Sequence, residues 1–152
     1  MERFVTSQFC DDIRNEAGNK FSLMGCYTSS LQVQSFPASL PKLCAEIRMF
    51  TPLDRPWGKL AVRIMRGDTA LGEVQFPAQD KTAIAPLEGA QWFQAIAFFV
   101  MTPFVIEAPC AIRVEVETEE GILRAGSLWI ELLDPANAAL VAQYPQLNRP
   151  SV

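Results

Sequence analysis

The fold of this chain is decided by the stretch Cys110–Leu133, which reads CAIRVEVETEEGILRAGSLWIELL. Apolar residues stand at every second position from 112 to 116, with Arg and Glu residues between them. Such alternation places the two sets of side chains on opposite faces of a β-strand. After a Glu-Glu-Gly turn the alternation returns over residues 122–133, where Trp129 and Glu131 stand between apolar neighbours. The stretch therefore predicts a β-hairpin with one buried face.

Similar patterns recur along the rest of the chain, separated by glycine and proline. Apolar segments that favour strands cover residues 3–11, 20–27, 43–49, 59–64, 69–76 and 96–106. The last segment is apolar at nearly every position, which is typical of a strand covered on both faces. Segments 33–41 and 77–90 contain prolines, which have no backbone N–H to donate to a neighbouring strand. We therefore predict that these two segments are long connections between two sheets.

About eight strands at this spacing predict an all-β protein, a two-sheet antiparallel β-sandwich. One segment, about 135–143, is predicted to be a short C-terminal helix, because Asp134 can cap it, Pro135 suits its first position and Pro145 ends it. The length of 152 residues fits one domain. We therefore expect a single domain over residues 1–145 and a C-terminal tail over residues 146–152.

The composition excludes several classes of chemistry. The chain contains no histidine, so it cannot build a Ser-His-Asp triad, a Cys-His pair or a His-ligated zinc. Its 13 Lys and Arg residues against 17 Asp and Glu residues give a net charge of −4, which offers no electrostatic basis for binding nucleic acid or an anionic membrane. No apolar run approaches the roughly 20 residues of a membrane span. We expect no cofactor, no nucleic-acid partner and no membrane association.

The cysteines bear on the cellular compartment. They stand at positions 10, 26, 44 and 110, a spacing that matches no CxxC or zinc-ribbon motif. Their even number would permit two disulfides, but the N-terminal sequence Met1-Glu2-Arg3-Phe4 does not read as an export signal. We therefore expect reduced, buried thiols and a cytoplasmic location, in the host cytoplasm or, for a phage-encoded protein, in the virion.

The densest acidic cluster comprises Asp11, Asp12 and Glu16. These residues are weak candidates for a divalent-cation site, because Ca²⁺ and Mg²⁺ take several carboxylate oxygens as ligands. The alternative is a polar corner, in which the aspartates cap backbone N–H groups and Arg14 pairs with a carboxylate. The second interpretation is favoured, so the sequence predicts no metal site. It also predicts no catalytic residues.

Two tryptophans, Trp57 and Trp92, fall in segments predicted to be loops, where aromatic residues are often contact residues. Trp57 follows a proline-stiffened loop, which loses little entropy on binding. We expect Trp57 to be at least partly exposed, with Arg55 near it at the edge of a contact surface, and Trp92 as a further candidate. The competing interpretation is that Trp57 folds back into one end of the sandwich.

An N-terminal block resembles a family signature. Its residues are Phe9-Cys10-Asp11-Asp12-Ile13-Arg14, Glu16, Asn19-Lys20 and Leu23-Met24-Gly25-Cys26-Tyr27. This block is similar to the start of an uncharacterised family of small bacterial and phage proteins, a domain of unknown function. The resemblance implies a bacterial or phage origin and transfers no mechanism, because that family has no assigned activity.

These features favour a non-enzymatic β-sandwich protein that acts through protein–protein contacts, as a homo-oligomer or as a small bacterial or phage assembly component. The partner would be another protein or a second copy of the chain. The alternative is a small-ligand module that binds a carbohydrate or a nucleobase with its loop tryptophans. A flat apolar patch would support the first function, and a shallow cleft floored by Trp the second.

Overall fold

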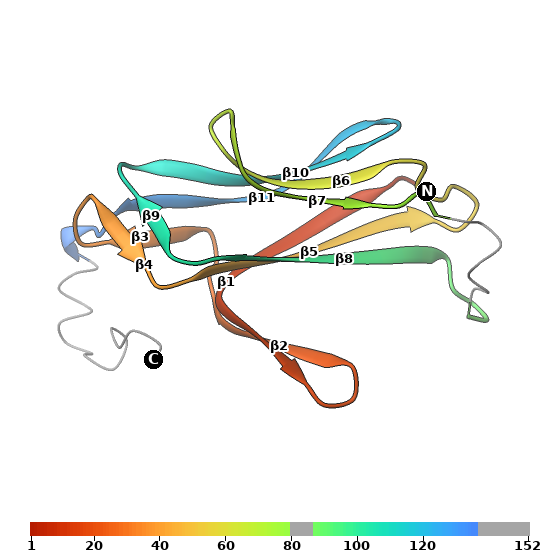
Figure 1. Cartoon of the computed structure of the whole chain (residues 1–152), viewed down its shortest axis with the longest axis horizontal. Coiled ribbons are helices and arrows are strands. Elements are labelled where there is room, and N and C mark those ends of the chain that lie inside the picture. Colours follow the sequence, from red (N-terminus) through yellow and green to blue (C-terminus); the bar gives the residue numbers. More distant parts are fainter. Residues whose placement is uncertain (80–86, 137–152) are drawn as a thin grey trace. The chain divides into compact units, whose positions relative to one another are not determined.

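The computed structural model describes residues 1–79 and 87–136, and these residues form an all-β protein (Figure 1). They divide into two compact units, each assembled from three segments of the chain. Unit 1 contains Met1–Gln8, Ala45–Phe99 and Ile112–Ser127, as far as these are described. Unit 2 contains Phe9–Cys44, Val100–Ala111 and the described residues from Leu128 on. The single domain expected over residues 1–145 stays a prediction.

Eleven strands lie in the described part of the chain. In chain order they are β1 (Phe4–Glu16), β2 (Lys20–Cys26), β3 (Ser30–Val33), β4 (Ala38–Leu40), β5 (Leu43–Pro52), β6 (Leu60–Arg66), β7 (Thr69–Phe76), β8 (Trp92–Met101), β9 (Phe104–Ile106), β10 (Cys110–Thr118) and β11 (Gly121–Leu132). The strand order is β2-β1-β5-β8 in a four-stranded sheet and β3-β11-β10-β6-β7 in a five-stranded sheet, while β4 and β9 form a separate pair.

The hairpin predicted from Cys110–Leu133 is confirmed, because β10 and β11 are neighbours in the five-stranded sheet. In unit 1, β10 also pairs antiparallel with β6, with Val114 opposite Ile64. Both of these side chains are fully buried. The alternate positions of the same ladder place Glu115 opposite Arg63, so the charged residues share the other face.

Within unit 1 the two larger sheets pack face to face. Phe99 of β8 belongs to the four-stranded sheet and Gly72 of β7 to the five-stranded sheet. A Cβ atom at Gly72 would lie only 3.2 Å from the Phe99 ring, so the absence of a side chain lets the ring approach the opposite sheet. This is the layered packing of a β-sandwich.

The strand count and pairing differ from the predicted antiparallel sandwich of about eight strands. β3 pairs with β11 in parallel, with Leu31 opposite Ile130. β4 and β9 pair antiparallel in a sheet of their own. The predicted strand over residues 96–106 is divided between β8 and β9, with Pro103 in the break, where proline would remove a ladder donor. Strands of three or four residues are too short for an alternation pattern to reveal them.

The expectation that residues 96–106 are covered on both faces is wrong. Phe99 is buried, whereas Phe98 is 41% exposed, and Val100 and Val105 are also exposed. Side chains alternate along β8, so the face that carries Ala97 and Phe99 packs on the core, whereas the opposite face, which carries Phe98 and Val100, is left uncovered.

The structure describes no residue after position 136. The helix predicted over 135–143, apart from its first two residues, and the tail predicted over 146–152 therefore lie outside the described residues. At the expected start of the helix, the backbone N–H of Ala136 donates a hydrogen bond to Oδ1 of Asp134 at 3.0 Å. This is the contact expected of a capping aspartate. In the part of the chain that the structure describes, no helix is long and apolar enough to span a membrane.

We predict that alanine at Gly25 destabilises the fold far more than alanine at Gly67. Both glycines have positive φ, +64° and +58°, a conformation that costs about 1 kcal/mol for alanine. A Cβ at Gly25 would also overlap the Asp11 carboxylate, which is held by a 2.5 Å hydrogen bond from the Tyr27 hydroxyl. Urea unfolding should give losses of about 2–4 kcal/mol for Gly25→Ala and about 1 kcal/mol for Gly67→Ala, which meets open space. Equal losses would contradict the overlap.

Candidate functional site

Arg3 is the centre of a polar cluster in unit 1. Its side chain is 2% exposed, and Nη2 lies 2.5 Å from Oε1 of Glu119. Nη2 also donates to the backbone carbonyls of Arg55 and Pro56, each at 3.1 Å. Nε donates to Oγ1 of Thr51 at 3.0 Å. The buried positive charge is thus both paired and hydrogen-bonded, which a charge removed from water requires.

The guanidinium of Arg3 covers the indole of Trp57, with Cζ 4.5 Å from the ring centroid. Trp57 is only 1% exposed, and its backbone N–H donates to Oε1 of Gln79 at 3.1 Å. The prediction of a partly exposed Trp57 is therefore wrong, and the competing interpretation of a buried ring is correct. The physical reason is a cation–π contact with a residue at the start of the chain, which no local pattern around Trp57 indicates.

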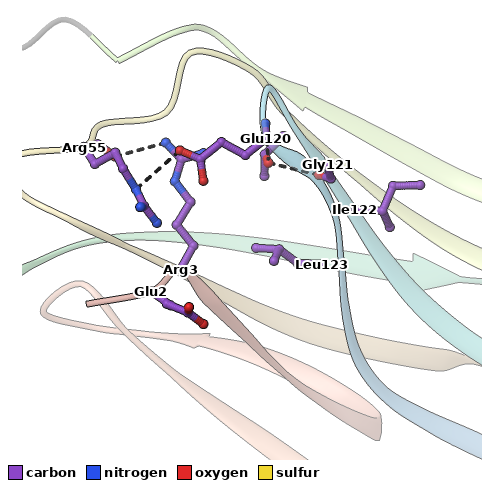
Figure 2. A pocket seen from close by; sticks show the side chains of 8 residues that line it. Glu2, Arg3, Arg55, Glu120, Gly121, Ile122 and Leu123 are labelled. Carbon is purple, nitrogen blue, oxygen red and sulfur yellow. Dashed lines mark hydrogen bonds and ion pairs between the residues drawn. The ribbon is translucent and has the colours of Figure 1, made fainter.

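Arg55 is exposed and borders a pocket, not an exposed indole, so its place at the edge of a contact surface stays a prediction. Its Nε lies 3.4 Å from Oε1 of Glu120. Figure 2 shows the two arginines and Glu120 gathered on one side of this pocket. The volume is about 270 Å³, and the wall consists of Glu2, Arg3, Arg55, Thr118, Glu120, Gly121, Ile122 and Leu123. Two acidic and two basic side chains balance each other, so the wall has no net charge.

Two buried donors in this cluster lack a hydrogen-bond acceptor among the described residues, namely Nη1 of Arg3 and Nε1 of Trp57. Nη1 has only an ion-pair contact, 3.6 Å from Oε2 of Glu120. Buried donors in native proteins are nearly always satisfied by protein or by ordered water.

Glu119 fixes the turn between β10 and β11 against the segment before β6. Its Oε2 accepts hydrogen bonds from the backbone N–H groups of Gly58 at 3.1 Å and Lys59 at 2.9 Å. Burial alone would raise the pKa of Glu119, but the hydrogen bonds from Arg3 and from the Lys59 backbone outweigh it and lower the pKa to about 2. Glu119 thus remains ionised and keeps Arg3 paired well into acid.

Trp92 begins β8 and is half-buried in an aromatic cluster, rather than standing in a loop. Phe4 stacks on Phe50 with ring centroids 4.5 Å apart and meets Trp92 edge to face at 5.2 Å. Ile96 and Phe98 follow on the same face of β8 as Trp92, because side chains alternate along a strand. We call these five residues the β8 patch. Phe4 and Phe98 are 42% and 41% exposed, so the patch is a partly exposed apolar surface of unit 1, with the exposed Gln94 of β8 on the same face.

The main-chain edge of β8 differs from the other edges of the two larger sheets. β8 has ten residues and no charged side chain, and it has no strand on its outer side among the described residues. β2 carries Lys20, β7 carries Glu73, and β3 has only four residues. Charge and shortness protect an edge from unwanted pairing. β8 has neither protection.

Sequence reasoning missed Trp129, which is 61% exposed on β11 in unit 2. The strand alternation indicates that Trp129 is exposed, because it stands between Leu128 and Ile130, and both of these are buried. A residue between two core positions points to the opposite face.

The acidic residues considered as weak metal ligands are engaged separately in unit 2. Asp12 accepts a hydrogen bond from Nζ of Lys42 at 2.7 Å, and this bond lowers the pKa of Asp12. Asp11 accepts from the Tyr27 hydroxyl, and Glu16 accepts from Ser22 Oγ at 2.8 Å. Among the described residues, no group of three or more Cys, Asp or Glu side chains is arranged to hold a metal ion. The arrangement is a polar corner.

Comparison with known proteins gives a family and no mechanism. A family model described as a family of unknown function (DUF6941) matches residues 6–131. No curated protein matches the chain. The resemblance of the N-terminal block to an uncharacterised domain agrees with this match, while the bacterial or phage origin stays a prediction.

We predict that Glu119→Gln makes the free energy of unfolding depend less on pH in the acid range. The folded pKa of about 2 lies below the ordinary 4.5. The ionised carboxylate therefore contributes stability above pH 4.5, and this contribution is lost as the pH falls toward 2. Urea unfolding of the variant at pH values across this window should show a shallower loss than the wild type. Glu120→Gln leaves the Glu119 hydrogen bonds in place and serves as the control. An unchanged slope in Glu119→Gln would contradict the assignment.

We predict that two tryptophan truncations lower the stability by very different amounts. Trp57→Ala removes a sealed ring and the surface that Arg3 covers, so it should lower the free energy of unfolding by about 3–5 kcal/mol. Trp129→Ala removes a largely exposed ring and should cost less than about 1 kcal/mol. Denaturant unfolding followed by circular dichroism measures both. A Trp57→Ala variant as stable as Trp129→Ala would contradict the buried role.

Proposed function

We propose that this chain, which belongs to the family of unknown function described above, is a non-enzymatic protein that acts through protein–protein contacts. The observation that carries the proposal is the β8 patch together with the outer edge of β8, which carries no charge and has no neighbouring strand in the described part of the chain. An apolar face beside an uncharged main-chain edge offers two kinds of contact to one partner strand. Side chains supply buried apolar area, and backbone N–H and C=O groups supply hydrogen bonds.

The composition of the patch supports a protein partner. Interfaces are enriched in aromatic residues at their centres and depleted of charge. The β8 patch contains Phe4, Phe50, Trp92 and Phe98, and β8 itself carries no charge over its ten residues. Clusters of aromatic rings in such surfaces are where binding energy concentrates.

We assign a second copy of the chain as the partner, so that the protein is a homo-oligomer. Two copies of β8 can pair antiparallel about a two-fold axis, so that the outer edge of each strand, which has no partner strand among the described residues, meets the other copy. Because β8 is uncharged, this pairing brings no like charges of the strand into opposition. Each copy would cover the edge of the other.

The alternative function, a small-ligand module, draws support from the pocket beside Arg55. The pocket is small, and Arg3 adds a buried donor without an acceptor among the described residues. It lacks the floor of tryptophan that a carbohydrate or nucleobase module was expected to use, since no aromatic residue is part of the described wall. The contact function therefore ranks first. A cytoplasmic location and a role in a bacterial or phage assembly stay predictions.

We predict that Phe98→Glu dissociates the oligomer. Near the two-fold axis it would place two carboxylates in an apolar contact, so the dimer should weaken at least about 30-fold, as a hot-spot loss of about 2 kcal/mol implies. Sedimentation of the purified chain should give about twice the 16.9 kDa chain mass for the wild type and the single mass for the variant.

Ile122→Glu is the matched control, because Ile122 is an exposed strand residue of unit 1 outside the β8 patch. It should sediment as the wild type does. A wild type that stays monomeric up to about 100 µM would contradict self-association. A Phe98→Glu variant that remains a dimer would show that the interface lies elsewhere.

A further inference from the structure

Three cysteines of unit 2 lie on neighbouring strands. Cys10 is on β1, Cys26 is on β2 and Cys44 is on β5, and the order of these strands is β2-β1-β5. None of them is in a disulfide. Cys10 and Cys44 are buried, whereas Cys26 is exposed, so the expectation of buried thiols is wrong for Cys26. Cys26 is the last residue of β2, and its thiol is the one of these three that is open to solvent.

Cys10 and Cys26 are directly opposed in the antiparallel β1–β2 ladder, a hairpin that can be followed in Figure 1. The backbone N–H of Tyr27 donates to the carbonyl of Phe9 at 2.9 Å. This bond joins the residue after Cys26 to the residue before Cys10, which is the pattern around a non-hydrogen-bonded pair. In such a pair the Cα atoms are about 4.5 Å apart and the side chains share one face.

That separation is within the range of about 4.4–6.8 Å found for disulfides. The strands would therefore not need to move for the two sulfur atoms to meet. In the reduced protein the Cys10 thiol donates a weak hydrogen bond to the Asp12 carbonyl at 3.4 Å. A rotation of this side chain releases that bond. Cys44 instead donates to the Asp11 carbonyl at 3.8 Å, and its burial keeps an external oxidant from reaching it.

We propose that Cys10 and Cys26 are a reversible dithiol–disulfide pair, with a small-molecule disulfide such as glutathione disulfide as the oxidant. The exposed Cys26 thiolate attacks one sulfur of glutathione disulfide and releases one glutathione thiolate. The Cys10 thiolate then attacks Sγ of Cys26 in the mixed disulfide and releases the second glutathione thiolate. The protein loses two electrons and two protons, and one glutathione disulfide becomes two glutathione molecules.

The second step is the slow one. Burial, reinforced by the neighbouring Cys44 and Cys26 thiols, raises the pKa of Cys10 to about 12. Only a small fraction of Cys10 is thiolate at neutral pH, and this fraction grows about tenfold for each unit of pH below the pKa. The mixed disulfide at Cys26 should therefore accumulate first and then resolve faster as the pH rises.

The test treats the folded, full-length chain with glutathione disulfide and follows its intact mass. The final product should be lighter than the reduced protein by about 2 Da, the two hydrogens lost, and peptide mapping should find Cys10 linked to Cys26. Between pH 7 and 9 the transient glutathione adduct should decay about tenfold faster per unit of pH. The oxidised protein should melt several degrees higher, because the crosslink restricts the unfolded chain.

Two variants decide the pairing. Cys26→Ser changes an exposed side chain and should abolish the loss of about 2 Da while leaving the circular dichroism spectrum unchanged. Cys44→Ser should still form the link. A glutathione adduct at Cys26 that never resolves, a link between Cys10 and Cys44, or no reaction at all would each overturn the proposal.

Discussion

The buried guanidinium of Arg3 is the interaction on which unit 1 depends. This one side chain contacts the end of β5 through Thr51, the loop after it through two carbonyls, and the β10–β11 turn through Glu119. It also covers the ring of Trp57. A buried charge is costly unless every contact is kept, so these segments must assemble together around it. The next residue, Phe4, contacts Phe50 and Trp92, so the contacts of Arg3 also position this aromatic cluster.

The edges of the two larger sheets explain why the contact function is assigned to β8. β7 carries Glu73, whose carboxylate pairs with Arg63 on the adjacent strand, and β2 begins with Lys20. β3 is too short to accept a long partner strand. A sheet edge that is both long and uncharged invites another strand, and natural proteins remove such edges unless they are used. Among the described residues, β8 lacks this protection, and it is the strand beside which the aromatic residues gather.

Unit 2 shows how polar and thiol groups can share one region without forming a metal site. Asp11 and Asp12 are neighbours in sequence, but a strand sends adjacent side chains to opposite faces. Asp12 therefore pairs with Lys42, while Asp11 meets Tyr27. The register of the β1–β2 ladder places Cys10 opposite Cys26. Acidic residues that are close in the sequence therefore have separate partners in the fold, and three cysteines that are distant in the sequence lie on neighbouring strands.

The sequence by itself determined the all-β class, the β10–β11 hairpin and the absence of histidine chemistry, because alternation and composition are local properties. It could not place Trp57, whose cover comes from Arg3, a residue 54 positions earlier in the chain. It also misjudged β8, because a run such as Ile96–Val100 reads alike in a strand covered on both faces and in a strand covered on one face. Whether a strand face is covered, and whether a strand has a neighbour, depends on pairings and packing between distant segments, and only the tertiary structure supplies them. The exposed patch and the opposed cysteines both arise from those pairings.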